Sequence, residues 1–317
     1  MISLVSAFVA NNRAFLGPHS AAQVGYYHRC NSFPQLSAEF SSSRDASQQA
    51  AIFAREEETR DEKKQIWRNV PIISSRPACP SGKSTLIEIQ VNAKMRQEYT
   101  TPGQFIQLRP NNDDATIDPI FLAMASAPTA SSGSDESTET FQFLVKMSPR
   151  LPWLPESLVE GSTVQISPVI GSGFPLHKLP AATNDDLSSF SIVLAAAGTG
   201  IAPLKACIES GLLPASPSTI LYYGEWTHED MCFTDVYDTW KNEYGVHVEP
   251  ALSRTSDSQG YIQEILSSKT SDDDGNHQHP SSPPAWAILC GMDDMVESCT
   301  QVLKEKGVPE DHILLNL

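Results

Sequence analysis

The chain has 317 residues, of which 40% are apolar and 19% are charged, and this length and composition predict two packed domains rather than one. Its 38 acidic residues outnumber its 22 lysines and arginines, so the formal net charge is −16. Such a chain lacks the basic surface that nucleic-acid binding requires, and it contains no apolar run long enough for a membrane helix. We therefore expect neither a nucleic-acid partner nor a membrane span.

Residues 1–65 have the composition of a targeting segment followed by a linker. Residues 1–38 contain no Asp or Glu but carry Arg13, Arg29 and many small or hydroxyl side chains, which is typical of mitochondrial and plastid transit peptides. A mixed-charge run follows over residues 55–65. We predict an unfolded transit peptide and linker, with plastid and mitochondrion both open. The alternative is a disordered tail that carries no targeting signal.

Residues 66–180 alternate between short β-prone runs and turn signals. Apolar and polar residues alternate over 85–91 and 141–145, as in strands that are buried on one face. One short helical piece is expected over 153–159. This region predicts a six-stranded antiparallel β-barrel. Its strands are expected at residues 70–75, 84–91, 104–108, 120–125, 141–147 and 163–169.

Residues 187–317 change to an alternation of strands and helices. The run 190–196 is almost continuously apolar, as expected of a buried parallel strand. The pattern predicts a doubly wound α/β domain with a parallel five-stranded sheet. Strands are expected at 190–196, 219–223, 246–252, 285–290 and 313–317, and helices at 203–211, 233–244, 261–266 and 295–307.

The cysteines and histidines do not predict a metal site. The six cysteines form no Cys-x-x-Cys pair, and their spacing fits neither zinc nor iron–sulfur ligation; their sparse use favours a reducing compartment. The acidic run 272–274 lies near His277 and His279 among Gly, Ser and Pro residues, which indicates a solvated insertion rather than a metal clip.

The most informative turn follows the first strand of the second domain. The strand runs into Gly198-Thr199-Gly200, and Pro203 falls in the first turn of the next helix, where its missing N–H costs nothing. Backbone amides and the positive end of the helix would face an anion there, which suits the pyrophosphate of a dinucleotide. A plain strand–helix turn is the alternative interpretation of so short a pattern.

The residues around this turn resemble a known family. Residues 196–203 resemble the Ala-Gly-Gly-Thr-Gly-Ile-Ala-Pro pyrophosphate motif of the ferredoxin–NADP reductase-like family. Residues 221–224 resemble the start of its second βα unit, and residues 252–254 with 260–263 resemble its adenosine-end segment. Residues 289–295 resemble its Cys-Gly-Pro-x-x-Met turn.

The resemblance extends into the barrel, with one departure. Residues 102–105 read Pro-Gly-Gln-Phe and residues 171–174 read Gly-x-Gly-Phe, as in the family, and the plant fruit-protein-type FAD/NAD(P)-binding branch is most similar. The family's flavin motif Arg-x-Tyr-Ser, however, falls on Ile120, Leu122 and Ala123, and its later Gly-x-x-Ser falls on residues 150–153. Phe121 or Trp153 is a candidate replacement for the stacking Tyr, and barrel core is the alternative for both.

The resemblance implies a flavin-binding-type barrel, FAD, and NADP or NAD as cofactors. Hydride would pass from the nicotinamide to FAD, and electrons would go on to an unidentified acceptor. Cys290 is the expected catalytic residue beside the nicotinamide, with a small apolar strand-end role as the alternative. The residues assigned to cofactor binding are Phe121, Leu122, Ala123, Ser126, Gly171, Gly173, Phe174, Gly198, Thr199, Gly200, Pro203, Gly224, Ser253, Arg254, Tyr261, Gly291, Met292 and Leu317.

Within that set, the resemblance gives individual roles. Ser253 and Arg254 are expected to receive a 2′-phosphate, which slightly favours NADP over NAD. Tyr261 is expected to pack on the adenosine and Leu317 to lie near the flavin ring. Two functions remain open: a flavin-dependent NAD(P)H oxidoreductase, and a non-catalytic nicotinamide-nucleotide-binding or redox-sensing module that has lost flavin.

Overall fold

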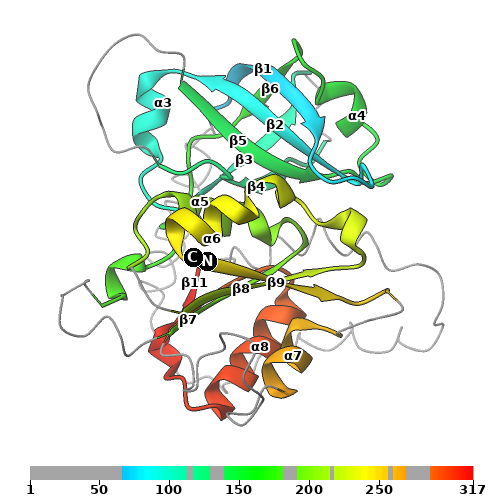
Figure 1. The fold of residues 1–317 in the computed structure, drawn as a ribbon. Coiled ribbons are helices and arrows are strands. Elements are labelled where there is room, and N and C mark those ends of the chain that lie inside the picture. The colour runs from blue at the N-terminus through cyan, green and yellow to red at the C-terminus, as the bar shows by residue number, and fades with distance from the viewer. Residues whose placement is uncertain are drawn as a thin grey trace, which may run out of the picture. The chain divides into compact units, whose positions relative to one another are not determined.

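The computed structural model describes residues 66–112, 117–128, 139–180, 191–214, 218–255, 260–268 and 286–316 (Figure 1). The part of the chain from Trp67 onward clusters as one compact unit. The predicted leader before residue 66, the run 272–274 with its neighbouring histidines, and Leu317 lie outside the described residues.

The first half of this unit is the predicted antiparallel barrel. Its six-stranded sheet has the order β4-β3-β6-β1-β2-β5, and an antiparallel bridge between Met124 and Phe143 joins the two ends of that order. Ile87, Phe141 and Phe143 are fully buried inside it. The strands are β1 (Arg68–Pro77), β2 (Ser84–Val91), β3 (Phe105–Pro110), β4 (Ile120–Ala123), β5 (Glu139–Lys146) and β6 (Thr163–Ile166).

Two short helices accompany the barrel. Helix α4 (Leu154–Ser157) lies within the predicted helical piece, whereas α3 (Ala93–Glu98) was not predicted. The side chain of Asn92 caps α3 by accepting a hydrogen bond from the amide of Met95 at 2.9 Å. Six residues carry too little periodicity to reveal a helix, so only this cap could have indicated it.

The second half is the predicted parallel α/β domain. Its five-stranded sheet has the order β11-β10-β7-β8-β9, and every described pairing in it is parallel. The strands are β7 (Ser191–Ala197), β8 (Ser218–Glu225), β9 (Val246–Leu252), β10 (Trp286–Cys290) and β11 (Ile313–Leu315). All seven residues of β7 are buried, which explains why its sequence shows no alternation.

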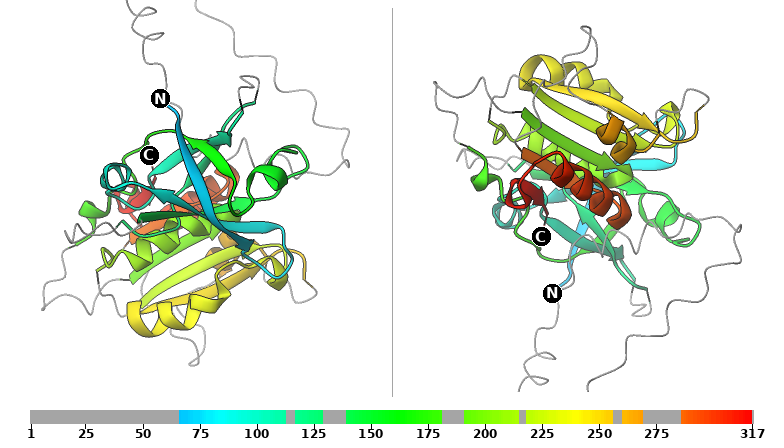
Figure 2. Two further views of the ribbon diagram at one scale, coloured as in Figure 1. Left: turned by 90° about the horizontal axis from the view of Figure 1, so that it is seen from above. Right: turned by 90° about the horizontal axis from the view of Figure 1, so that it is seen from below.

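Helices cover both faces of this sheet (Figures 1 and 2). Helices α5 (Ile201–Glu209) and α6 (Tyr237–Tyr244) lie on the face turned toward the barrel, and α7 (Ile262–Ser268) and α8 (Asp293–Glu305) lie on the other. Single 3₁₀ turns occur at Leu176–Lys178, Gly198–Gly200, His228–Asp230, Thr234–Val236 and Glu310–His312.

Polar contacts bind the α/β domain to the barrel. The Lys205 ammonium on α5 is buried; it donates to the Glu209 carboxylate at 2.6 Å and to the backbone oxygen of Ala125, next to β4, at 3.4 Å. The hairpin between β1 and β2 makes a second connection, since the amide of Ser81 donates to the backbone oxygen of Glu229 at 2.8 Å.

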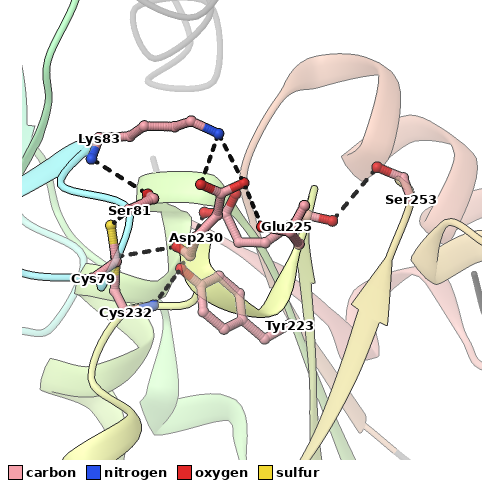
Figure 3. A network of polar contacts seen from close by, with 9 residues as sticks. Cys79, Ser81, Lys83, Tyr223, Glu225, Asp230, Cys232 and Ser253 are labelled. Atoms are coloured by element: carbon pink, nitrogen blue, oxygen red, sulfur yellow. Dashed lines mark hydrogen bonds and ion pairs between the residues drawn. The ribbon is translucent and has the colours of Figure 1, made fainter. Parts of the chain in front are cut away.

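Lys83 and Asp230 form the charged part of that second connection (Figure 3). The Lys83 ammonium lies 2.8 Å and 3.0 Å from the two carboxylate oxygens of Asp230, whose side chain is only 4% exposed. Burial alone would raise the pKa of Asp230, but hydrogen bonds from Lys83, Ser81 and Thr227 outweigh it and lower that pKa below its ordinary value.

The Lys83–Asp230 contact predicts an acid-sensitive contribution to stability. A carboxyl group whose pKa is lowered by folding stabilises the protein above its unfolded pKa, here about 3.8, and that stability is lost as the pH falls through the folded pKa. Asp230→Asn is expected to lower the free energy of unfolding at pH 7 by about 1–2 kcal/mol, because Lys83 remains partly in water. Urea titrations should show the difference shrinking below about pH 4.

The exposed Glu160 provides a matched control, since it is a carboxylate without a described ion pair. Glu160→Gln should leave the free energy of unfolding unchanged at both pH values. A constant destabilisation by Asp230→Asn across the pH range would contradict this account.

Candidate dinucleotide site

The turn between β7 and α5 has the geometry of an anion-binding turn. Gly198 adopts φ of +56°, in the left-handed region, so that the chain reverses direction directly after the buried strand. The Gly198–Gly200 turn leads straight into α5, whose nine residues begin at Ile201. The turn lies at the carboxyl edge of the parallel sheet, where nucleotides bind in such folds and where a helix N-terminus favours anions.

Gly200 lies against the end of β10. A Cβ atom at Gly200 would meet the backbone oxygen of Cys290, would lie 2.7 Å from its carbonyl carbon and would lie 3.0 Å from Gly291 Cα. These are backbone atoms, so a side chain could be accommodated only by displacing a strand end. Gly291 likewise lies close to Ala197: a Cβ atom at Gly291 would lie 3.1 Å from the backbone nitrogen of Ala197. The ends of β7 and β10 therefore meet only because residues 200 and 291 lack side chains.

Cys290 is nearly enclosed at this junction. Its side chain is 3% exposed, and burial raises the pKa of its thiol to about 12. The thiol is therefore protonated at neutral pH and is not a nucleophile. This environment agrees with the apolar alternative for Cys290. The neighbouring Met292, by contrast, is 45% exposed and precedes α8.

The ends of β8 and β9 carry the residues that the resemblance assigns to the adenosine end of a dinucleotide. The amide of Ser253 donates to the oxygen of Glu225 at 3.1 Å, and the amide of Arg254 donates to the oxygen of Trp226 at 2.9 Å. The Arg254 guanidinium carbon lies 3.7 Å from the centroid of the Trp226 ring. Tyr261, at the start of α7, is 58% exposed and thus open to a ligand.

Two barrel lysines that sequence reasoning missed also approach Trp226. The ammonium groups of Lys83 and Lys146 lie 4.9 Å and 5.1 Å from the centroid of its ring. Together with Arg254 they place three cations around one indole, which favours an anionic ligand group here. No sequence signal links these lysines to Trp226, because they come from the other domain.

Glu225 is buried beside this cluster (Figure 3). It accepts a hydrogen bond from the Tyr223 hydroxyl at 3.2 Å, and burial raises the pKa of its carboxyl, an effect that nearby Lys146 opposes. Gly224, assigned to the cofactor by resemblance, lies close to α7: a Cβ there would lie 3.1 Å from Ile262 Cδ1.

On the barrel side, the closing segment serves chiefly to hold the fold together. The amide of Phe174 donates to Pro102 O at 2.8 Å, and Gln104 donates to Gly171 O at 2.9 Å. A Cβ at Gly103 would lie 3.1 Å from Asn316 Cβ, so the end of β11 also packs here. Gly173 has φ of +74° and fits tightly against residues 101 and 102. Ser126 accepts from the amide of Gln142 at 3.2 Å.

The flavin motif positions on β4 are filled with apolar side chains. Ile120, Leu122 and Ala123 are 2%, 6% and 3% exposed. Ile120 and Leu122 pack into the barrel core, and Ala123 packs with Phe105. They can provide neither the cation, the stacking ring nor the hydroxyl that the family motif provides. The described residues at these positions therefore do not fit the diphosphate of FAD.

A recess remains beside β4, which we call the barrel recess. It is narrow, with a volume of about 30 Å³, and is lined by β4, the end of β5, Leu151, Leu154, Thr199 of the Gly198–Gly200 turn and Ala202 of α5. Phe121 lines it and packs on Phe105, with ring centroids 5.9 Å apart. Trp153, the other candidate stacking residue, packs against the barrel core and does not line the recess.

The described residues contain no group of three His, Cys, Asp or Glu side chains placed to hold a metal ion. None of their helices combines the length and apolar character needed to cross a bilayer.

Comparisons with known proteins agree with this architecture. Residues 194–301 match the family described as the oxidoreductase NAD-binding domain. The fruit protein pKIWI502 of Actinidia deliciosa is 27% identical over 265 residues, which cover 79% of this chain and 77% of that protein. The anthranilate 1,2-dioxygenase electron transfer component of Acinetobacter baylyi is 26% identical over 246 residues, 74% of this chain but only 62% of that protein.

A solved structure shows the same fold. The cytochrome P450 reductase GcoB of Amycolatopsis superposes with a TM-score of 0.59 at 17% identity, over 80% of this chain and 70% of that one. The resemblance to the ferredoxin–NADP reductase-like family is thereby confirmed, and with it the two-domain architecture. The chain carries an oxidoreductase NAD-binding domain joined to a barrel of the ferredoxin reductase-like type.

The two glycines of the turn predict different mutational costs. Gly200→Ala is expected to abolish measurable dinucleotide binding, because its methyl group must push the end of β10 away. At Gly198 a Cβ atom would have no neighbour within 4 Å. Gly198→Ala is therefore expected to lower the free energy of unfolding by only about 1 kcal/mol, because alanine disfavours the left-handed φ there. Calorimetric titration with NADPH measures both variants, and thermal melts confirm that they are folded. Equal affinity of folded Gly200→Ala and of the wild type would refute the assignment of this turn.

Proposed function

We propose that this chain is an NAD(P)H-dependent oxidoreductase that binds the dinucleotide across the carboxyl ends of β7, β8, β9 and β10. The observation that carries the proposal is the backbone contact of Gly200 with Cys290 at the carboxyl edge of the sheet, directly before α5, where a helix N-terminus favours an anion. A plain strand–helix turn does not require glycines both in the turn after one strand and directly after its neighbour. The match of residues 194–301 to the oxidoreductase NAD-binding domain supports the same function.

The residues present fit a nicotinamide dinucleotide. The turn would hold the pyrophosphate through backbone amides and the N-terminus of α5. Arg254, Lys83 and Lys146 would surround an adenosine phosphate, and Tyr261 would cover the adenine. The nicotinamide end would lie near Cys290, whose neutral thiol provides a polarisable contact rather than a charge. The dinucleotide itself supplies the hydride.

The resemblance also implies FAD as the hydride acceptor, with electrons passing on to a separate acceptor. The apolar residues Ile120, Leu122 and Ala123 instead favour the second candidate function, a nicotinamide-nucleotide-binding or redox-sensing module without flavin. The two differ in one measurable property, because only the oxidoreductase consumes NAD(P)H in the presence of an electron acceptor.

Binding and turnover of the full chain test the proposed function. Calorimetry should show binding of NADPH or NADH, and the absorbance of the reduced nicotinamide should fall when ferricyanide is added. The same measurements on Gly200→Ala provide the matched control. Binding without oxidation by any acceptor would establish the binding module. No binding of either dinucleotide would refute both candidates.

The basic cluster predicts a preference for NADPH over NADH. Arg254→Ala should weaken NADPH binding about tenfold or more while changing NADH binding little, because a charge-assisted hydrogen bond to a phosphate contributes about 1.5–3 kcal/mol. Arg254→Lys should keep part of the preference for NADPH, because lysine retains the positive charge but lacks the paired N–H donors of the planar guanidinium. Competition calorimetry with both dinucleotides measures this. A wild-type chain that binds them equally would show that the cluster recognises no 2′-phosphate.

The localisation remains a prediction from residues 1–65 alone. We propose import into a plastid or mitochondrion, which fusion of these residues to a fluorescent protein would distinguish from a cytosolic location.

A further inference from the structure

Glu225 ends β8 directly before Trp226, at the place where the proposed function puts an adenosine phosphate. Its main-chain oxygen holds the segment that follows β9, because it accepts hydrogen bonds from the amide of Ser253 at 3.1 Å and from the Ser253 hydroxyl at 3.5 Å (Figure 3). A carboxylate is thus built into the same junction as the two residues, Ser253 and Arg254, that are expected to receive a 2′-phosphate.

The carboxyl group of Glu225 is held on the side of the sheet that faces the barrel. Side chains two positions apart on a strand share a face, and Tyr223 belongs to an apolar cluster that also contains Leu144 of the barrel. The Tyr223 hydroxyl accepts a hydrogen bond from the amide of Cys232 at 3.4 Å and donates to Glu225 Oε1 at 3.2 Å (Figure 3). The position of the carboxyl group is therefore fixed between the two domains.

Lys146, at the end of β5, is a barrel cation whose charge this carboxylate offsets. It favours the ionised form of Glu225, against the effect of burial. The Lys146 ammonium also lies 5.1 Å from the centroid of the Trp226 ring, so the cation and the carboxylate lie on either side of the same junction. A ligand phosphate drawn to Lys146 would approach Glu225 as well.

The charges around Trp226 nearly cancel when Glu225 is ionised. Lys83 is paired with Asp230 at 2.8 Å, which leaves Lys146 and Arg254 as the cations whose charge Asp230 does not balance. Three cations and two carboxylates sum to a net charge of +1, and protonation of Glu225 raises this sum to +2. One proton therefore doubles the net positive charge that an approaching phosphate meets.

The other groups that act on Glu225 keep their charge between about pH 5.5 and 8.5. Burial raises the pKa of the Cys232 thiol to about 12, and it raises the pKa values of Tyr223 and Tyr237 well above their ordinary range, so all three stay neutral. Asp230 stays ionised, because hydrogen bonds from its partners lower its pKa. The exposed His228 is present in the wild type and in every variant below, so its charge cancels in their comparison.

We infer that Glu225 is a specificity-determining residue whose carboxylate opposes the 2′-phosphate of NADP(H), whereas NAD(H), which lacks this group, binds almost equally well in both charge states. Burial raises the pKa of Glu225 above its ordinary value of 4.5. The ionised form therefore repels the phosphate at high pH, and this opposition fades as the pH falls through the raised pKa. The preference for the phosphorylated dinucleotide is thus regulated by pH.

Glu225→Gln tests this inference, which rests on the proposed function, because glutamine keeps the size of the side chain and an acceptor for the Tyr223 hydroxyl. Calorimetric titrations of the full chain at pH 8 use NADP⁺ and NAD⁺, since the reduced forms decompose in acid. The variant is expected to bind NADP⁺ about threefold to tenfold more tightly and NAD⁺ within about twofold of the wild type. The exposed Glu243→Gln on α6 provides the matched control and should change neither Kd.

The same titrations across pH 5.5 to 8.5 provide a readout that a structural disturbance would not give. The ratio of the NADP⁺ Kd of the wild type to that of Glu225→Gln should fall toward one as the pH is lowered. The 2′-phosphate itself gains a proton in this range, but it does so in both proteins and cancels from the ratio. Lys146→Gln should have the opposite effect and weaken NADP⁺ binding, because it removes a positive charge instead of a negative one.

The outcomes separate this inference from the proposed function. An unchanged NADP⁺ Kd in folded Glu225→Gln, an equal gain for NAD⁺, or a ratio that is constant with pH would each overturn the role of Glu225. Thermal melts check folding, and Glu225→Ala, which also removes the charge, serves if the glutamine variant does not fold. Failure of the proposed function appears differently, as a wild-type chain that binds neither dinucleotide at any pH.

Discussion

The contact of Gly200 with the backbone of Cys290 is the constraint on which the candidate site depends. The turn after β7 can approach the end of β10 this closely only where no side chain intervenes, and the chain has glycine at both places, 200 and 291.

The barrel is held to this edge by contacts of different chemical kinds. Lys83 and Asp230 form an ion pair, and Lys205 connects α5 to the barrel through a backbone oxygen. Asn316 packs against Gly103 at the closing segment. The same lysine lies 4.9 Å from the Trp226 ring centroid, so it both joins the domains and adds positive charge beside Trp226.

The two regions that resemble cofactor motifs differ in how closely they match. The turn at Gly198–Gly200 has the glycines of the motif, whereas β4 has apolar side chains that pack into the barrel core at the flavin-motif positions. Burial of Ile120 and Leu122 stabilises the barrel but withdraws the charge that a diphosphate needs.

The sequence by itself determined the two-domain architecture, the order of strands and helices along the chain, and the turn at Gly198–Gly200. Local periodicity and the spacing of glycines encode these features. It also located Arg254 and Tyr261 at the ends of their elements. Only the tertiary structure revealed α3, the enclosure of Cys290 and the packing role of Gly224. The lysines around Trp226 belong in the same group, since their proximity depends on how the barrel docks on the sheet. Contacts between residues far apart in the chain follow from packing, which no local pattern encodes.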